Sequence, residues 1–159
     1  MKRILALVLL STACSSEADV EPKSGTWNYN GSTIVTNTCG VDPLTDPSGG
    51  FTLTVTGPGK FTVTDESFDN AFECTYDGGS YNCPKRLAGS NQPESSIDAT
   101  LIYNVKISGT LDSDHELSGT QTVELSCEGA DCELALTTFF PEAKLPCTYS
   151  YTFSADATA

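Results

Sequence analysis

The amino-acid sequence predicts an all-β protein built as a single antiparallel β-barrel of about 8–10 short strands. Apolar and polar residues alternate with a period of two along most of the chain after Gly25. Turn-forming Gly, Pro, Asp and Asn residues separate the alternating runs, and no stretch has the periodicity of an amphipathic helix. A disulfide-stapled β-sandwich is the alternative that fits the same pattern.

The strands are predicted from their apolar faces. Phe51, Leu53 and Val55 alternate with threonines, and Tyr103 and Val105 belong to another such run. Abundant threonine and aromatic residues are typical of half-buried strands. The expected strands lie near residues 25–30, 33–39, 50–56, 60–65, 71–77, 80–85, 97–111, 116–127, 132–139 and 147–154. Residues 88–96 are expected to form the longest polar connection.

The N-terminal residues have the order of an export signal. Two basic residues precede a short apolar run at 4–10, and small residues at 11–13 precede Cys14. This order resembles the signal peptide of bacterial lipoproteins, which implies that Cys14 is lipidated and begins the mature protein. Ser15, rather than Asp, follows the cysteine, and the same resemblance then implies the outer membrane. An ordinary secretory signal is the alternative.

This interpretation divides the chain into four parts. Residues 1–13 are the expected signal peptide, and residues 14–24 are the lipidated cysteine with a flexible tether. Residues 25–155 form the expected all-β domain, and residues 156–159 are a C-terminal tail. The apolar run near the N-terminus is far shorter than the roughly 20 residues that a transmembrane helix needs. Membrane contact is therefore expected through the lipid.

The cysteine count agrees with lipidation. The chain has seven cysteines, which is an awkward number for an exported protein. A lipid on Cys14 leaves six, and an even set in an oxidising compartment predicts three disulfides. The six are Cys39, Cys74, Cys83, Cys127, Cys132 and Cys147.

Local sequence predicts how these cysteines pair. Asp77-Gly78-Gly79-Ser80 is a strong hairpin signal, and a turn centred there places Cys74 opposite Cys83. Cys127 and Cys132 flank another turn-like segment and could pair in the same way. Cys39 and Cys147 remain, and are paired by elimination.

Charge and composition exclude some partners. The net charge is −13, and loss of Lys2 and Arg3 with the signal peptide makes it −15. A surface this acidic argues against nucleic acid, which binds basic surfaces. It also argues against electrostatic adsorption to anionic lipid.

Gly25-Thr26-Trp27 stands at the start of the predicted domain. This triplet is similar to the G-x-W motif of lipocalins and related calycin barrels, and the resemblance implies a lipocalin-like barrel with Trp27 plugging one end. The lipocalin pattern also has a basic residue near the last strand that packs on this tryptophan, whereas Lys144 is the nearest one here. Trp27 as an ordinary core aromatic is the alternative.

No residues are assigned to catalysis, a cofactor or a metal. His115, the only histidine, lies in an expected turn, so no His-activated nucleophile or zinc site is predicted. Asp112, Asp114 and Glu116 alternate as at the start of a calcium loop, but the glycine and the final acid of an EF-hand are missing. We therefore expect a protein that is not an enzyme.

The expected function is that of a non-enzymatic cell-envelope lipoprotein whose barrel binds a small apolar ligand or an envelope component. The aromatic side chains expected inside are Trp27, Phe51, Tyr103, Tyr149, Tyr151 and Phe153. A structural, interaction or inhibitor protein at the cell surface is the alternative, with loops 40–50 and 86–97 as partner-binding segments. Oligomeric state is not predicted.

Overall fold

The protein is a closed antiparallel barrel of eight strands. A computed structural model describes residues 20–40, 47–65 and 70–158, so the expected signal peptide and Cys14 lie outside the described residues. The strands run in chain order around the barrel, and β1 pairs with β8 to close it. This closure confirms the predicted barrel and excludes the β-sandwich. No helix among the described residues is long and apolar enough to cross a bilayer.

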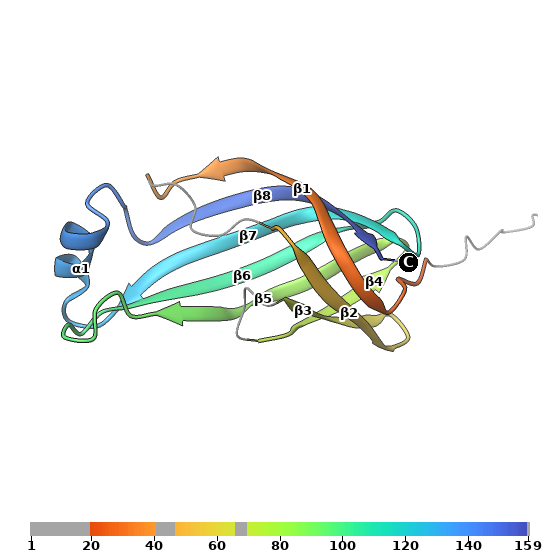
Figure 1. Ribbon diagram of the computed structural model, residues 1–159, viewed down its shortest axis with the longest axis horizontal. Helices are drawn as coiled ribbons and strands as arrows, with labels where there is room; N and C mark the ends of the chain where they lie inside the picture. The colour runs from red at the N-terminus through yellow and green to blue at the C-terminus, as the bar shows by residue number, and fades with distance from the viewer. Residues whose placement is uncertain (1–19, 41–46, 66–69, 159) are drawn as a thin grey trace, which may run out of the picture.

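The strands differ in length, so some extend further along the barrel than others. The bounds are β1 Gly25–Asn37, β2 Gly50–Gly57, β3 Lys60–Asp65, β4 Phe72–Asp77, β5 Ser80–Asn91, β6 Thr100–Leu111, β7 Glu116–Glu128 and β8 Cys147–Ala157. Tight turns join β2 to β3, β4 to β5 and β6 to β7 at one end of the barrel, which we call the hairpin end. The longer connections lie at the other, or loop, end. Strands β5 to β8 extend further toward the loop end than β2 to β4 (Figure 1).

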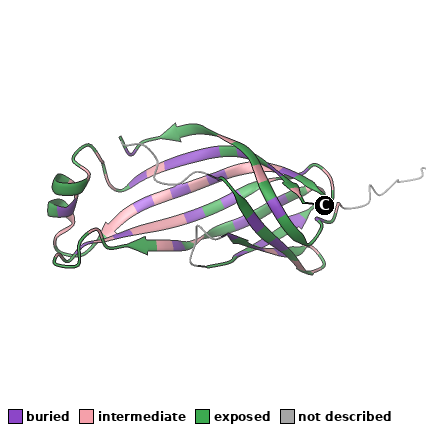
Figure 2. Cartoon of the chain, viewed as in Figure 1, coloured by how far each residue is buried: buried purple, intermediate pink, exposed green. Residues whose placement is uncertain are grey.

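Alternating burial along each strand separates the interior from the surface. In β4, Phe72, Cys74 and Tyr76 are buried while the residues between them are exposed. Figure 2 shows the same alternation as buried and more exposed residues following one another along the strands. A side-chain period of two places every second residue on the inner wall, so the sequence pattern predicted the inner wall correctly.

Several predicted elements differ from the observed ones. The expected strands 25–30 and 33–39 form the single strand β1, which has register irregularities between Tyr29 and Gly31 and between Ile34 and Thr36. These irregularities interrupt the period-two pattern and make one strand resemble two. Strand β5 continues through Asn91 into the expected polar loop, and β8 continues through Ala157 into the expected tail.

The expected strand at 132–139 is wrong, because Cys132–Phe139 is the helix α1. Strands β7 and β8 pair directly from Glu116↔Asp156 to Leu125↔Cys147, which leaves no position for a strand between them. The segment is rich in Glu, Leu and Ala, which favour helix. Its only buried residue is Ala135, so the helix has no strong apolar face that the sequence pattern could reveal.

All three predicted disulfides are present. Cys39 joins Cys147, Cys74 joins Cys83, and Cys127 joins Cys132. The predicted hairpin register is also confirmed, since Asp77, Tyr76 and Thr75 pair with Ser80, Tyr81 and Asn82. The bridges link the ends of β1 and β8, the hairpin β4–β5, and the start of α1 to β7.

Candidate functional site

The six aromatic side chains expected inside the barrel all lie on its inner wall. Five are buried and Tyr103 is partly buried. Near the hairpin end, Trp27 stacks on Phe51 with ring centroids 6.2 Å apart. Tyr29 lies 4.8 Å from Phe51 and meets Phe153 edge-on at 5.3 Å. The hairpin half of the interior is therefore packed with aromatic rings.

Trp27 is fully buried at the start of β1. Its indole Nε1 donates to the carbonyl of Lys23 at 3.0 Å, which satisfies its only polar group. Trp27 thus packs as a core aromatic.

Four polar side chains lie among these rings, and we call them the interior polar cluster: Tyr29 of β1, Asp65 of β3, Tyr81 of β5 and Gln121 of β7. Asp65, Tyr81 and Gln121 are exposed by 5%, 5% and 1%. The Tyr29 hydroxyl donates to Asp65 Oδ2 over a long 3.4 Å. The cluster therefore brings polar groups from four strands into a mainly apolar interior.

The Tyr81 side chain lies over the next two strands, β6 and β7, because each carries a glycine at that level. Gly109 of β6 and Gly119 of β7 pair directly, and Tyr81 pairs with Gly109. A Cβ at Gly109 would come within 2.8 Å of the Tyr81 hydroxyl, and one at Gly119 would come closer still. The two glycines thus leave the space that the phenol occupies.

Two atoms of the cluster are buried without a hydrogen-bond partner, the Tyr81 hydroxyl and Gln121 Oε1. Gly119, against which the Tyr81 hydroxyl lies, and Gln121 are successive inward positions on β7. Leaving a buried polar group unpaired costs about 1–3 kcal/mol.

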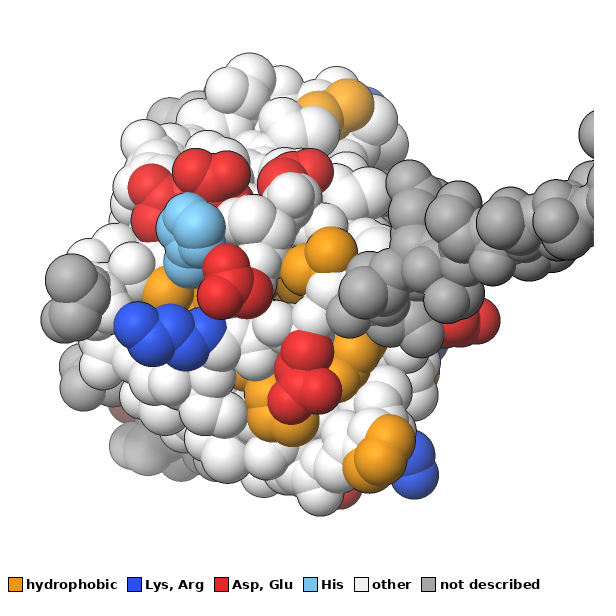
Figure 3. All heavy atoms as spheres, turned by 90° about the vertical axis from the view of Figure 1, so that its right-hand side faces the viewer, with side chains coloured by type: hydrophobic (Ala, Val, Ile, Leu, Met, Phe, Trp, Pro, Cys, Tyr) orange, Lys and Arg blue, Asp and Glu red, His pale blue; other side chains and the backbone are white. Residues whose placement is uncertain are grey.

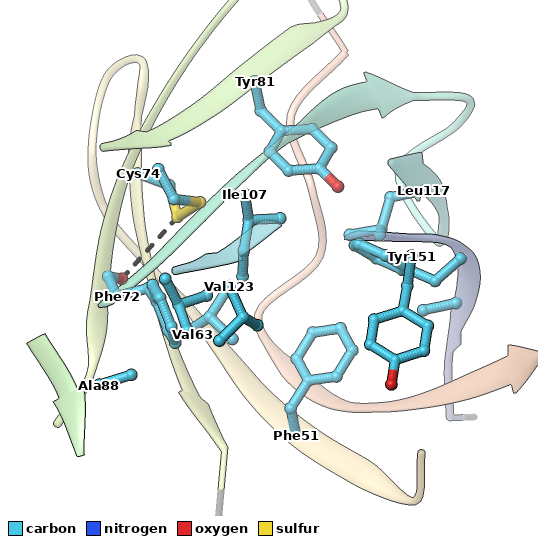
Figure 4. Close-up of a cluster of buried hydrophobic side chains, with 14 of the residues drawn as sticks. Phe51, Val63, Phe72, Cys74, Tyr81, Ala88, Ile107, Leu117, Val123 and Tyr151 are labelled. Atoms are coloured by element: carbon cyan, nitrogen blue, oxygen red, sulfur yellow. Dashed lines mark hydrogen bonds between the residues drawn. A yellow bond between two sulfur atoms is a disulfide. The ribbon is translucent and has the colours of Figure 1, made fainter. Parts of the chain in front are cut away.

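The surroundings of the cluster are apolar: Figure 4 shows the side chains of Phe51, Val123 and Tyr151 pointing into the interior.

Burial also controls the protonation of the phenols. Desolvation is the main cause that raises the pKa of Tyr29, and Asp65 and Tyr81 add to it. Desolvation likewise raises the pKa of Tyr81, with a further contribution from Asp112. Both hydroxyls therefore stay protonated and keep a proton to donate.

Arg86 is the only Lys or Arg of the described residues that is not exposed. Its register partner is Val105, its guanidinium carbon lies 3.8 Å from the centroid of the Phe72 ring, and its Nη2 donates to the Asn70 carbonyl. Burial lowers its pKa, while Glu73 opposes this shift. Its Nε is buried without a partner.

The acidic turn between β6 and β7 lies at the hairpin end, where Figure 3 shows the histidine beside acidic side chains. Asp112 accepts hydrogen bonds from Thr110 and Ser118, while Asp114 Oδ1 lies 2.6 Å from His115 Nδ1. These carboxylates therefore have different partners rather than a common centre. No group of three or more His, Cys, Asp or Glu among the described residues is arranged to hold a metal.

A shallow depression of about 470 Å³ lies on the outer wall over β2 to β5. It is open to solvent, and its lining includes the outward-facing Thr62, Thr75 and Asn82 with Lys60 and Glu73. These groups are ordinary outward residues of a β-sheet, and the interior cluster is the stronger candidate site.

None of the four cluster residues was singled out from the sequence. The signal was the same alternation that predicted the core, since Gln121 is two residues before Val123 and Asp65 is two residues after Val63. A polar residue in the inward phase of a strand is unusual and could have been flagged. Recognising Tyr81 needed the cross-strand register as well.

No family model, curated protein or solved structure matches the chain.

Proposed function

We propose that this protein is a non-enzymatic, lipid-anchored protein of the bacterial cell envelope whose barrel binds a small, mainly apolar molecule. The observation that carries the proposal is the interior polar cluster, in which the Tyr81 hydroxyl and Gln121 Oε1 are buried without a partner. An eight-stranded barrel has an interior that side chains can just fill or that can hold one small ligand. A polar group on such a ligand would offset the cost of the unpaired atoms.

The N-terminal residues support an anchor at the hairpin end. Pro22 is fully buried, and the Lys23 amide donates to the Asp114 carbonyl at 2.7 Å. The Ser24 hydroxyl accepts from the Val55 amide at 2.8 Å. These contacts hold residues 20–24, the end of the expected tether, against the hairpin turns. An anchor on Cys14 would then keep the hairpin end toward the membrane and the loop end away from it.

A binding role also agrees with the chemistry of the described groups. His115 is exposed in a turn and is paired with Asp114. The six domain cysteines are oxidised, so none supplies a thiolate. The acids of the turn have separate partners. We therefore propose binding rather than catalysis.

The test is to identify what the full chain carries. The protein is purified from bacterial membranes, extracted with organic solvent, and the extract is analysed by mass spectrometry. We expect a small molecule in near-equimolar amount from the wild type and from Thr54→Val, an exposed outward position on β2. Gln121→Leu should fold and lose it, because the variant replaces the unpaired acceptor with an apolar side chain. Equal amounts from all three proteins, or none, would contradict the proposal.

A second candidate is a partner-binding surface at the loop end. Leu134 and Phe139 of α1 are exposed by 53% and 43%, and exposed apolar groups of this size favour protein contacts when they are contiguous. Photo-crosslinking from position 134 in intact cells tests this role. A specific adduct that Phe139→Ser removes would favour it, and the absence of any adduct would exclude it.

A further inference from the structure

We infer that the ligand of the barrel is an apolar amine, whose protonated nitrogen is held by the interior polar cluster. This inference rests on the proposed function and names the chemistry of its ligand. It is carried by the acceptor character of Gln121 and Asp65, by the aromatic rings beside them, and by the placement of the basic side chains.

The two unpaired atoms of the cluster can both accept a hydrogen bond. Gln121 Oε1 is an acceptor only and is unpaired, and the Tyr81 hydroxyl has lone pairs as well as its proton. The Asp65 carboxylate accepts from Tyr29 and, like any carboxylate, can accept several hydrogen bonds. An ammonium group, with several N–H donors and a positive charge, matches this set better than a carboxylate or a ketone.

The rings around the cluster favour a cation for a second reason. Tyr29 packs against Phe51 at 4.8 Å and against Phe153 at 5.3 Å, beside the Asp65 carboxylate. Aromatic faces attract cations, more strongly where water is excluded. Beyond the rings, the register partners of Gln121 are Ile107 and Tyr151, so the body of the ligand would meet apolar surface.

The one basic side chain of the described residues that is not exposed already has contacts of its own. Of the Lys and Arg residues in the described part of the chain, only Arg86 is not exposed. Its guanidinium lies over Phe72, bonds to the Asn70 carbonyl, and interacts electrostatically with Glu73 on the outer side of β4. The net charge of −13 also attracts cations from solution. An anionic ligand held by Arg86 is the competing outcome.

The experiment compares three probes with the same alkyl chain: decylamine, decanol and decanoate. Their affinities for the purified full-length protein are measured by titration calorimetry at neutral pH, below their micelle concentrations. We expect decylamine to bind at least ~10-fold more tightly than decanoate, as a desolvated ion pair with aromatic contacts would give. Asp65→Asn should reduce this preference to within about threefold, and Thr54→Val should leave it unchanged.

Gln121→Met is the second variant, in case Asp65→Asn does not fold, which circular dichroism will show. Gln121→Met keeps the volume of the side chain and removes the unpaired acceptor, so it should weaken the binding of decylamine more than the binding of decanol. Decanoate binding as tightly as decylamine would overturn this inference and leave the proposed function standing. If none of the three probes binds and the membrane-purified protein carries no small molecule, both fail.

Discussion

Removing the Cys39–Cys147 bridge should destabilise the protein more than removing the Cys74–Cys83 bridge. All four cysteines are buried, with exposures of 1%, 6%, 2% and 1%. Replacing either pair with alanine therefore removes similar side chains from similar surroundings. What differs is the length of chain that each bridge closes, which is 108 residues for the first and 9 for the second.

The magnitude follows from the entropy that a bridge removes from the unfolded chain. The loop-closure relation assigns about 4.8 kcal/mol to the long-range bridge and about 2.6 kcal/mol to the hairpin bridge. The difference of about 2 kcal/mol corresponds to about 6 °C in melting temperature for a domain of this size. Cys127–Cys132, with a separation of 5, should contribute least.

Thermal unfolding of the three double-alanine variants, followed by circular dichroism and by calorimetry, measures these differences. The β-sheet signal at low temperature serves as the control that each variant folds. The expected order of melting temperatures is lowest without Cys39–Cys147, intermediate without Cys74–Cys83, and highest without Cys127–Cys132. A hairpin variant that melts at or below the long-range variant would refute the argument from the unfolded chain.

Gly119→Ala should lower the free energy of unfolding by about 1–3 kcal/mol, because its methyl would lie 2.7 Å from a carbonyl oxygen of β6. Gly57→Ala is the control and should change this free energy little, since nothing lies within 4 Å of a Cβ there; urea titrations measure both. His115, whose pKa is raised by the hydrogen bond to Asp114 above its ordinary value of 6.5, should titrate by NMR above that value, and Asp114→Asn should lower its pKa. Because the pKa of His115 is higher in the folded protein than in the unfolded chain, its pairing with Asp114 adds a small stabilisation below pH 6.5, which is lost as the pH rises through the folded pKa. An unchanged pKa of His115 in Asp114→Asn would contradict the pairing. Mass spectrometry of membrane-purified protein should find an acylated N-terminus at Cys14, and an unmodified N-terminus elsewhere would exclude the anchor.

The candidate site was less predictable than the fold, for a physical reason. Period-two alternation reports which side of a strand faces inward, so Phe51, Tyr149 and Tyr151 were predicted inside from their phase alone. The same phase does not report which inward residues meet across the barrel. The approach of Tyr81 to Gly119 depends on the register of β5 with β6 and of β6 with β7, and on two glycines far along the chain.

The sequence alone determined the all-β class, the inner and outer faces of most strands, and the pairing of Cys74 with Cys83. These features depend on local alternation and on turn chemistry, such as the Asp77–Ser80 hairpin that aligned Cys74 with Cys83. Only the tertiary structure decided the number of strands, because the pairing of β7 with β8 excluded residues 132–139 from the sheet. It also decided that Gln121 and Tyr81 are buried without partners, since hydrogen bonding across a barrel depends on strands that the chain brings together only when it closes.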